Sequence, residues 1–189
     1  MFNMNIAILG GRFDPPHIWH FWTAQQVLEN VVGIDQVWYM PDFQNALKPI
    51  VASTSDRVEM LRFMETGRIR LSMIALSQTS VTYTVSIVSE LIKDLNNKYY
   101  WIVGSDILNE FSKWRDYQKL TRLINFLVVP RKDFPIKNLP SGFTKIDGNL
   151  MLSNVSSTII RERLKRNHTI AGLVFPEVEK YIREKNLYK

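Results

Sequence analysis

Two histidines that stand three residues apart, His17 and His20, are the first groups in the sequence that could do chemistry. On a first helical turn they share one face, so both imidazoles point toward one spot. Two such rings can donate hydrogen bonds to phosphoryl oxygens as negative charge builds up on them. A zinc ion would need further ligands, and only His168 and carboxylates remain to supply them. We therefore expect no metal ion held by the protein itself.

The residues directly before the histidines would allow a ligand to approach the backbone closely. Gly10 and Gly11 end a short apolar run, and glycine there permits a sharp turn and a close ligand. The helix that follows offers free N–H groups and a positive dipole end, which suit phosphate. Arg12 either adds a cation to that site or is a solvated loop charge. Taken alone, the two glycines are also compatible with a plain turn.

A second segment, from Ser156 to Arg161, has the features of another anion site. Ser156 or Ser157 can cap the N-terminus of the helix that begins there, and the freed N–H groups can bind an anion. Arg161 follows about one turn later and can hold a phosphate through its planar guanidinium. An ordinary N-cap followed by a surface arginine is the alternative.

The apolar patterns predict the framework that must position these segments. Strands alternate with helices, which is typical of an α/β protein with a Rossmann-like, doubly wound, mainly parallel sheet and helices on both faces. In such folds ligands bind at the carboxyl ends of the strands. The predicted strands are Asn5–Leu9, Gln36–Met40, Ile69–Leu71, Tyr99–Val103 and Asn125–Val129. The predicted helices are Trp19–Asn30, Ser55–Met64, Val85–Leu95, Ser157–Lys165 and Pro176–Glu184, with loops over residues 42–54 and 132–141.

Composition limits the class of protein. A length of 189 residues suits one domain, 1–189, with one sizeable core. The absence of cysteine excludes disulfides and cysteine-bound zinc and favours a reducing cytoplasm. No apolar run is long enough to cross a membrane, and we expect no signal peptide. The net charge of +6 fits a solvated basic surface or an attraction for nucleotide phosphates or nucleic acid. Nucleic acid is disfavoured, because aromatic and basic residues do not gather in surface motifs.

The first segment resembles the Gly-x-Phe-Asp-Pro-x-His-x-Gly-His signature of the adenylyl- and cytidylyltransferase superfamily. It departs from the pattern at Trp19, where the superfamily usually has glycine. It also has Arg12 where the bacterial pyridine-nucleotide branch has a small hydroxyl residue. The matching residues are Gly11, Phe13, Asp14, Pro15, His17 and His20.

The second segment resembles the Ile-Ser-Ser-Thr-x-Ile-Arg motif of the nicotinate/nicotinamide mononucleotide adenylyltransferase family, with Val155 in the first place. In that family the motif grips the phosphates of ATP. Gly104-Ser105-Asp106 resembles the family's Gly-Ala-Asp, and Asp106 could accept from ribose hydroxyls or cap a helix. Lys48 corresponds to a loop lysine of the family and could reach the phosphates.

Two further segments resemble the part of the family that surrounds the pyridine ring. Thr82-Tyr83-Thr84 matches Ser-Tyr-Thr, although Ser86 stands where the family usually has Asp. Thr84 is also a good N-cap for the predicted helix. Trp114 matches a downstream tryptophan and could stack on the ring, although tryptophan is more often part of a core.

The resemblance extends from Ile6 to Tyr188 and implies a nicotinate mononucleotide adenylyltransferase. Such an enzyme transfers AMP from ATP to the acceptor's 5′-phosphate, with Mg²⁺ bound to the nucleotide, and the chain could form a homo-oligomer. A superfamily member with a pantetheine phosphate or alcohol phosphate acceptor, a nucleic-acid-binding module and an inactive relative are the alternatives. The implied catalytic residues are His17 and His20. The implied ATP and phosphate residues are Gly10, Gly11, Arg12, Phe13, Lys48, Gly104, Asp106, Ser156, Ser157, Thr158 and Arg161. The implied pyridine-nucleotide residues are Asp14, Tyr83, Thr84 and Trp114.

Overall fold

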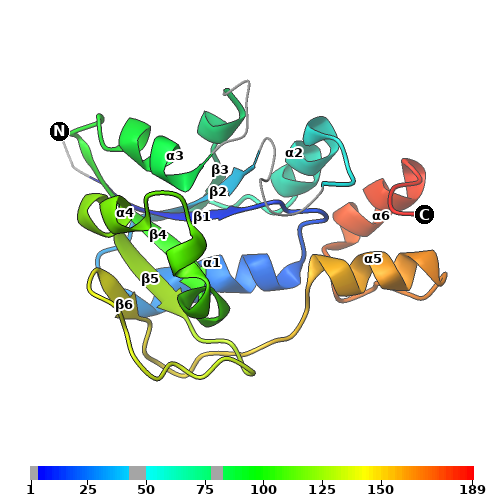
Figure 1. The fold of residues 1–189 in the computed structure, drawn as a ribbon. Helices are drawn as coiled ribbons and strands as arrows, with labels where there is room; N and C mark the ends of the chain where they lie inside the picture. Colours follow the sequence, from blue (N-terminus) through cyan, green and yellow to red (C-terminus); the bar gives the residue numbers. More distant parts are fainter. Residues whose placement is uncertain (1–3, 43–49, 78–82) are drawn as a thin grey trace.

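Parallel strands form the centre of the computed structural model, which describes residues 4–42, 50–77 and 83–189 (Figure 1). Six strands pair in the order β3-β2-β1-β4-β5-β6, and all five pairings are parallel. This confirms the predicted Rossmann-like α/β fold. The strands are β1 (Met4–Gly11), β2 (Gln36–Pro41), β3 (Ile69–Leu71), β4 (Asn97–Gly104), β5 (Asn125–Val129) and β6 (Phe143–Lys145).

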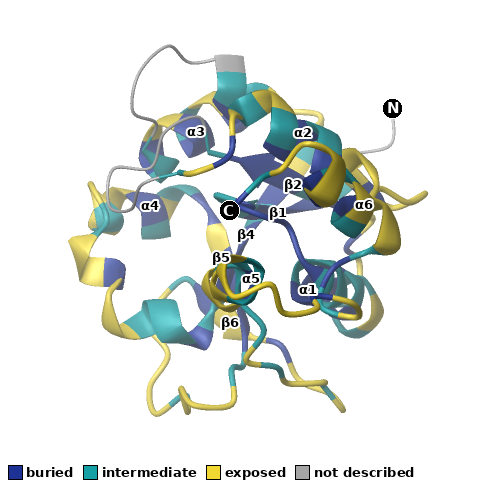
Figure 2. Ribbon diagram, turned by 90° about the vertical axis from the view of Figure 1, so that its right-hand side faces the viewer, coloured by how far each residue is buried: buried dark blue, intermediate teal, exposed yellow. Residues whose placement is uncertain are grey.

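Side chains of β1 point alternately to the two faces of the sheet and so belong to two separate hydrophobic clusters. Ala7 and Leu9 belong to a cluster with side chains of α1, α2, α5 and α6, whereas Ile6 and Ile8 belong to a cluster with α3 and α4. Figure 2 shows the buried strands between the layers of helices. The helices are α1 (Ile18–Asn30), α2 (Thr54–Arg62), α3 (Thr84–Leu91), α4 (Tyr117–Leu123), α5 (Ser157–Lys165) and α6 (Pro176–Glu184). Short 3₁₀ helices are η1 (Ile74–Ser77), η2 (Ser105–Asn109) and η3 (Phe111–Lys113).

The strand order reverses between β1 and β4, because the chain leaves β1 toward β2 and later returns to β4 on the other side. This is the switch point at which doubly wound sheets bind ligands. Gly10 and Gly11 end β1, and Gly104 ends β4 beside it. The predicted placement of these glycines at one edge of the sheet is therefore confirmed.

Several predicted boundaries differ from the structure. The helix predicted to reach Leu95 ends at Leu91, because the following residues turn into β4. Tyr83, not Thr84, is the N-cap of α3, and Thr84 is already helical. The strand β6 and the helix α4 were not predicted, because segments this short show no clear apolar period. Across the described ranges, no helix is long and apolar enough to span a membrane.

A side chain at Gly10 should destabilise the fold. A Cβ built there would lie 2.6 Å from Cζ2 of Trp101, a buried core ring. We expect Gly10→Ala to lower the free energy of unfolding by about 1–3 kcal/mol, because the core is overpacked. Denaturant unfolding measures it, with Gly67→Ala as control, since a Cβ at Gly67 meets no atom within 4 Å. Equal stability of the two variants would contradict the close packing of Trp101.

Candidate active site

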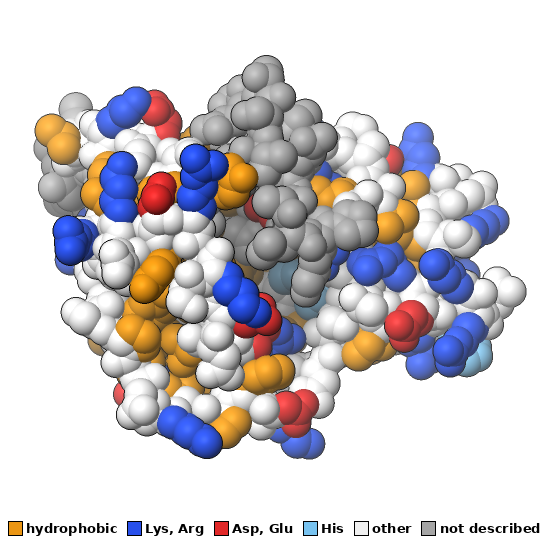
Figure 3. All heavy atoms as spheres, in the orientation of Figure 1, with side chains coloured by type: hydrophobic (Ala, Val, Ile, Leu, Met, Phe, Trp, Pro, Cys, Tyr) orange, Lys and Arg blue, Asp and Glu red, His pale blue; other side chains and the backbone are white. Residues whose placement is uncertain are grey.

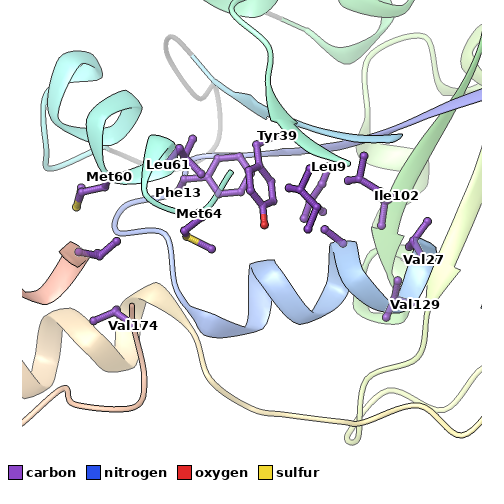
Figure 4. Close-up of a cluster of buried hydrophobic side chains, with 14 of the residues drawn as sticks. Leu9, Phe13, Val27, Tyr39, Met60, Leu61, Met64, Ile102, Val129 and Val174 are labelled. Atoms are coloured by element: carbon purple, nitrogen blue, oxygen red, sulfur yellow. The ribbon is translucent and has the colours of Figure 1, made fainter. Parts of the chain in front are cut away.

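The buried side chain of Phe13 holds the turn that follows β1 in place. This residue has a φ of +50°, in the left-handed region that few side chains adopt. Its buried ring packs edge-on against Tyr39, with 5.6 Å between ring centroids (Figure 4). It also contacts the ring of His20, at 4.7 Å. The surrounding packing holds the strained backbone, which sets the path of the chain into α1.

His17 and His20 lie together at the start of α1, as their spacing predicts. Their rings stack with centroids 3.7 Å apart, and the backbone N–H of His17 donates to Nδ1 of His20 at 3.1 Å. A neutral His20 therefore carries its proton on Nε2, which remains able to donate. Nδ1 of His17 is buried and has no hydrogen-bond partner in the described part of the chain. This bond thus leaves Nε2 of His20 unused, while Nδ1 of His17 is enclosed by the protein.

Both imidazoles are neutral at pH 7. Burial is the main cause that lowers the pKa of His17 to about 3, and the positive charge of Arg131 adds to it. Burial also holds the pKa of His20 well below its usual value, helped by His17 and Arg131. Neutral rings can still donate one N–H each, so they can stabilise phosphoryl charge without taking up a proton first.

Arg131, which the sequence analysis did not single out, follows β5 at the same edge of the sheet. Its Nη1 donates to Oδ2 of Asp106 at 2.9 Å. Ser105 holds its backbone, since the Ser105 hydroxyl accepts from the Arg131 N–H at 2.9 Å and donates to the carbonyl of Phe134 at 2.7 Å. A Cβ at Gly104 would collide with the Asp106–Arg131 pair. A residue with a side chain where β4 ends would therefore have to displace this pair.

The second predicted segment is bonded to the first. Ser156 is the N-cap of α5 and accepts from the N–H of Ile159 at 3.3 Å. The Ser157 hydroxyl donates to the carbonyl of Pro15 at 2.8 Å, and Nη1 of Arg161 donates to the carbonyl of Asp14 at 2.6 Å. These two bonds hold the N-terminus of α5 against the turn that leads to the histidines.

Arginines gather where α5 meets the turn. Nη2 of Arg161 also donates to the hydroxyl of the exposed Thr158 at 3.4 Å. The pKa of Arg12 is lowered, first by burial and then by the positive charge of Arg161, so the two cationic side chains repel each other. Neighbouring like charges of this kind favour a shared anion. Figure 3 shows histidine in a hollow of the surface, with Lys and Arg side chains beside it.

Asp14 has an internal role. It is fully buried, and its two carboxylate oxygens accept from the N–H groups of Val51, at 2.7 Å, and Ala52, at 3.0 Å. The carboxylate therefore holds the segment that precedes α2. A contact between Asp14 and a pyridine nucleotide stays a prediction.

Two of the predicted pyridine-side segments, around Tyr83 and around Trp114, lie near each other. Tyr83 is the N-cap of α3, and its own side chain makes no hydrogen bond to the helix. The guanidinium of Arg115 lies 4.6 Å from the centre of the Tyr83 ring. Trp114 is half-buried and packs on Phe111, with 5.4 Å between ring centroids. Lys48 lies outside the described residues.

The donors around the turn suit anions rather than cations. Within residues 4–42, 50–77 and 83–189, no three His, Asp or Glu side chains gather as a bound metal would require. Trp19, at the position usually occupied by glycine in the superfamily signature, is only 7% exposed, so its indole packs into the protein.

The position of this anion site, at the switch point of a parallel sheet, places the chain among the α/β proteins that bind nucleotides. A family model described as cytidylyltransferase-like matches residues 8–163. The chain is 35% identical to the probable nicotinate-nucleotide adenylyltransferase of Opitutus terrae, over 98% of both chains. It is 31% identical to the nicotinate-nucleotide adenylyltransferase of Bacillus subtilis, over 97% of this chain and 98% of that one. The chain therefore belongs to the cytidylyltransferase-like family and, within it, to the nicotinate-nucleotide adenylyltransferases.

A solved structure supports the fold assignment. The nicotinic acid mononucleotide adenylyltransferase of Plasmodium falciparum, complexed with NaAD, superimposes with a TM-score of 0.85. Sequence identity is 23%, and the match covers 98% of both chains. The same fold is thus kept at low identity.

A pH titration tests the histidine pair. Because the pKa of His17 is lowered to about 3, we expect its ring to take up no proton between pH 8 and 5 in the folded protein. The unfolded chain does take one up near pH 6.5, so His17 contributes a loss of stability as pH falls below that value. Histidine ring NMR shifts measure the titration, with the urea-unfolded protein as control. Arg131→Gln should raise both pKa values, and a wild-type midpoint near 6.5 for His17 would contradict the burial.

Proposed function

We propose that the chain is a nicotinate mononucleotide adenylyltransferase, which transfers AMP from ATP to the 5′-phosphate of nicotinate mononucleotide and releases pyrophosphate. The product is deamido-NAD. The observation that carries the proposal is the bonding of α5 to the turn after β1, through Ser157 and Arg161. It brings the N-terminus of α5 and Arg161 to the turn that leads into the neutral histidine pair. The full-length similarity to enzymes named for this reaction supports it.

The reaction is an in-line displacement. An oxygen of the acceptor's 5′-phosphate attacks the α-phosphorus of ATP, and the bond from that phosphorus to the bridging oxygen of pyrophosphate breaks. A phosphate monoester is already anionic at neutral pH, so the attack needs no general base. The neutral rings of His17 and His20 donate to oxygens of the phosphates undergoing transfer, and positioning supplies the rest of the acceleration.

The triphosphate would lie between the two bonded segments. Ser156, Ser157 and Thr158 present the N-terminus of α5 to its β and γ phosphates, and Arg12 and Arg161 supply charge. Gly10, Gly11 and Phe13 bring backbone close to the nucleotide, and Lys48 adds a cation. Gly104 and Asp106 would meet the ribose, and Oδ1 of Asp106, which has no partner in the described part of the chain, remains able to accept from a hydroxyl.

The acceptor would lie between α3 and the segment around Trp114. Trp114 stacks on the pyridine ring, and Tyr83, Thr84 and Asp14 surround the nucleotide. A ring carboxylate fits the N–H groups at the start of α3, because it only accepts, whereas the NH₂ of an amide would face donors. The guanidinium of Arg115 over Tyr83 favours the same negative charge.

Mg²⁺ would accompany ATP, held by phosphates and water, and would neutralise triphosphate charge. The residues around the turn fit this arrangement, because they bind anions and leave the cation to the nucleotide. We also propose that residues 1–189 work as one domain in the cytoplasm, without membrane or nucleic acid, and that a homo-oligomer could form.

An acceptor panel tests the function. We expect pyrophosphate only when ATP, Mg²⁺ and a pyridine mononucleotide are all present. Nicotinate mononucleotide should be preferred over the amide by about tenfold to a hundredfold in kcat/KM, because a buried donor facing a donor costs roughly 1–3 kcal/mol. Coupled pyrophosphate detection measures both. Activity with pantetheine phosphate but with neither pyridine mononucleotide would refute the acceptor assignment, and no activity with any acceptor would indicate an inactive relative.

Removal of either histidine ring tests its catalytic role. We expect His17→Ala and His20→Ala each to lower kcat by about 10²–10³-fold, the usual effect of losing one transition-state donor. The control is His168→Ala, because His168 is exposed and outside the site. Circular dichroism checks that each variant is folded. Turnover equal to that of the control in a folded variant would exclude a catalytic role for that ring.

A further inference from the structure

A guanidinium outside both phosphate-binding segments is buried beneath the turn after β1. Arg57, on α2, is 0% exposed and is among the largest fully buried side chains of the described residues. Burial of a charged group is costly unless the group is hydrogen-bonded. Such a residue therefore needs a structural or functional reason.

The contacts of Arg57 connect α2 to two segments that border the nucleotide site. Nη1 donates to the carbonyl of Arg12 at 2.7 Å, and Nη2 donates to the carbonyl of Asp42 at 2.7 Å. Nη2 also donates to the hydroxyl of Thr54 at 3.2 Å. Asp42 in turn donates its N–H to the carbonyl of Gly11 at 2.9 Å. One planar group thus fixes the turn after β1 and the residue after β2 relative to each other.

Asp14 makes the reciprocal connection. Its carboxylate binds the N–H groups of Val51 and Ala52, which precede α2, while Arg57 on α2 binds the carbonyl of Arg12. Burial lowers the pKa of Arg57, but the negative charges of Asp14 and Asp42 oppose this shift. The turn is therefore held on two sides by buried, charge-assisted hydrogen bonds, which are stronger than neutral ones.

We propose that Arg57 is a positioning residue for the nucleotide: it fixes the backbone of Arg12 and so keeps the Arg12 guanidinium near Arg161, at the place of the triphosphate. This inference rests on the proposed function for the identity of the anion. Arg57 itself touches no substrate, because its side chain is fully buried and its Nη1 and Nη2 donate to main-chain carbonyls and to the Thr54 hydroxyl. A lysine could not replace it, because a single ammonium lacks the planar fork that reaches two carbonyls at once.

The test separates positioning from stability. Arg57→Lys and Arg57→Met are compared with Met60→Ala, a variant of the same helix at a fully buried position with no part in the site. All three should lower the melting temperature. Only the Arg57 variants should raise KM for ATP, by at least about tenfold, the usual effect of losing a charged hydrogen bond. KM for the mononucleotide should change less than about threefold, and Arg57→Lys should be less impaired than Arg57→Met.

Direct binding of an unreactive ATP analogue, measured by calorimetry, distinguishes a failure of the positioning role of Arg57 from a failure of the proposed function. Weaker binding in Arg57→Lys than in Met60→Ala supports the positioning role even if no pyridine mononucleotide is a substrate, an outcome that would refute only the proposed function. If Arg57→Met does not fold, the comparison of Arg57→Lys with Met60→Ala alone tests the positioning role. Binding equal to that of Met60→Ala would overturn the inference.

A double-mutant cycle gives the second criterion. Because Arg57 acts through Arg12, Arg12→Ala should weaken analogue binding less in the Arg57→Lys background than in the wild type. Additive effects of the two substitutions would show that Arg57 supports only the fold.

Discussion

The parallel direction of the strands is the constraint on which the site depends. All five pairings are parallel, so β1, β4 and β5 end at one edge of the sheet. These ends carry or lead into the candidate site segments: the glycine turn, the Gly104–Asp106 segment and Arg131. Segments far apart in the sequence therefore meet without any long excursion of the chain, and the reversal of strand order beside β1 leaves room for a ligand there.

The site combines strong positive charge with two uncharged rings. Arg12, Arg131 and Arg161 supply fixed positive charge, and burial, together with the charge of Arg131, keeps His17 and His20 neutral. Under the proposed function the arrangement would separate two tasks, since the arginines would attract phosphate and the imidazoles would provide directed hydrogen bonds.

The sequence predicts those site residues that belong to a local pattern, and it misses those whose role depends on distant partners. The histidine spacing, the N-cap at Ser156 and the strand-end glycines each follow from a few neighbouring residues, and the structure places all of them at one edge. Arg57 and Arg131 were not found, because their importance comes from partners distant in sequence. Arg131 directly follows a predicted strand and Pro130, and that position was the one available signal. The sequence contains no such signal for Arg57, because its helix has the pattern of an ordinary amphipathic segment.

The bonds that join α5 to the turn after β1 link residues 142 and 147 positions apart in the chain. Contacts of such long range form late in folding, because the entropy of closing a large loop must be overcome first. A partly folded chain can therefore hold most of its sheet and still lack a nucleotide site. Nucleotide binding would select the fully folded molecule, so the nucleotide would raise the global stability of the protein and not only that of the surrounding loops.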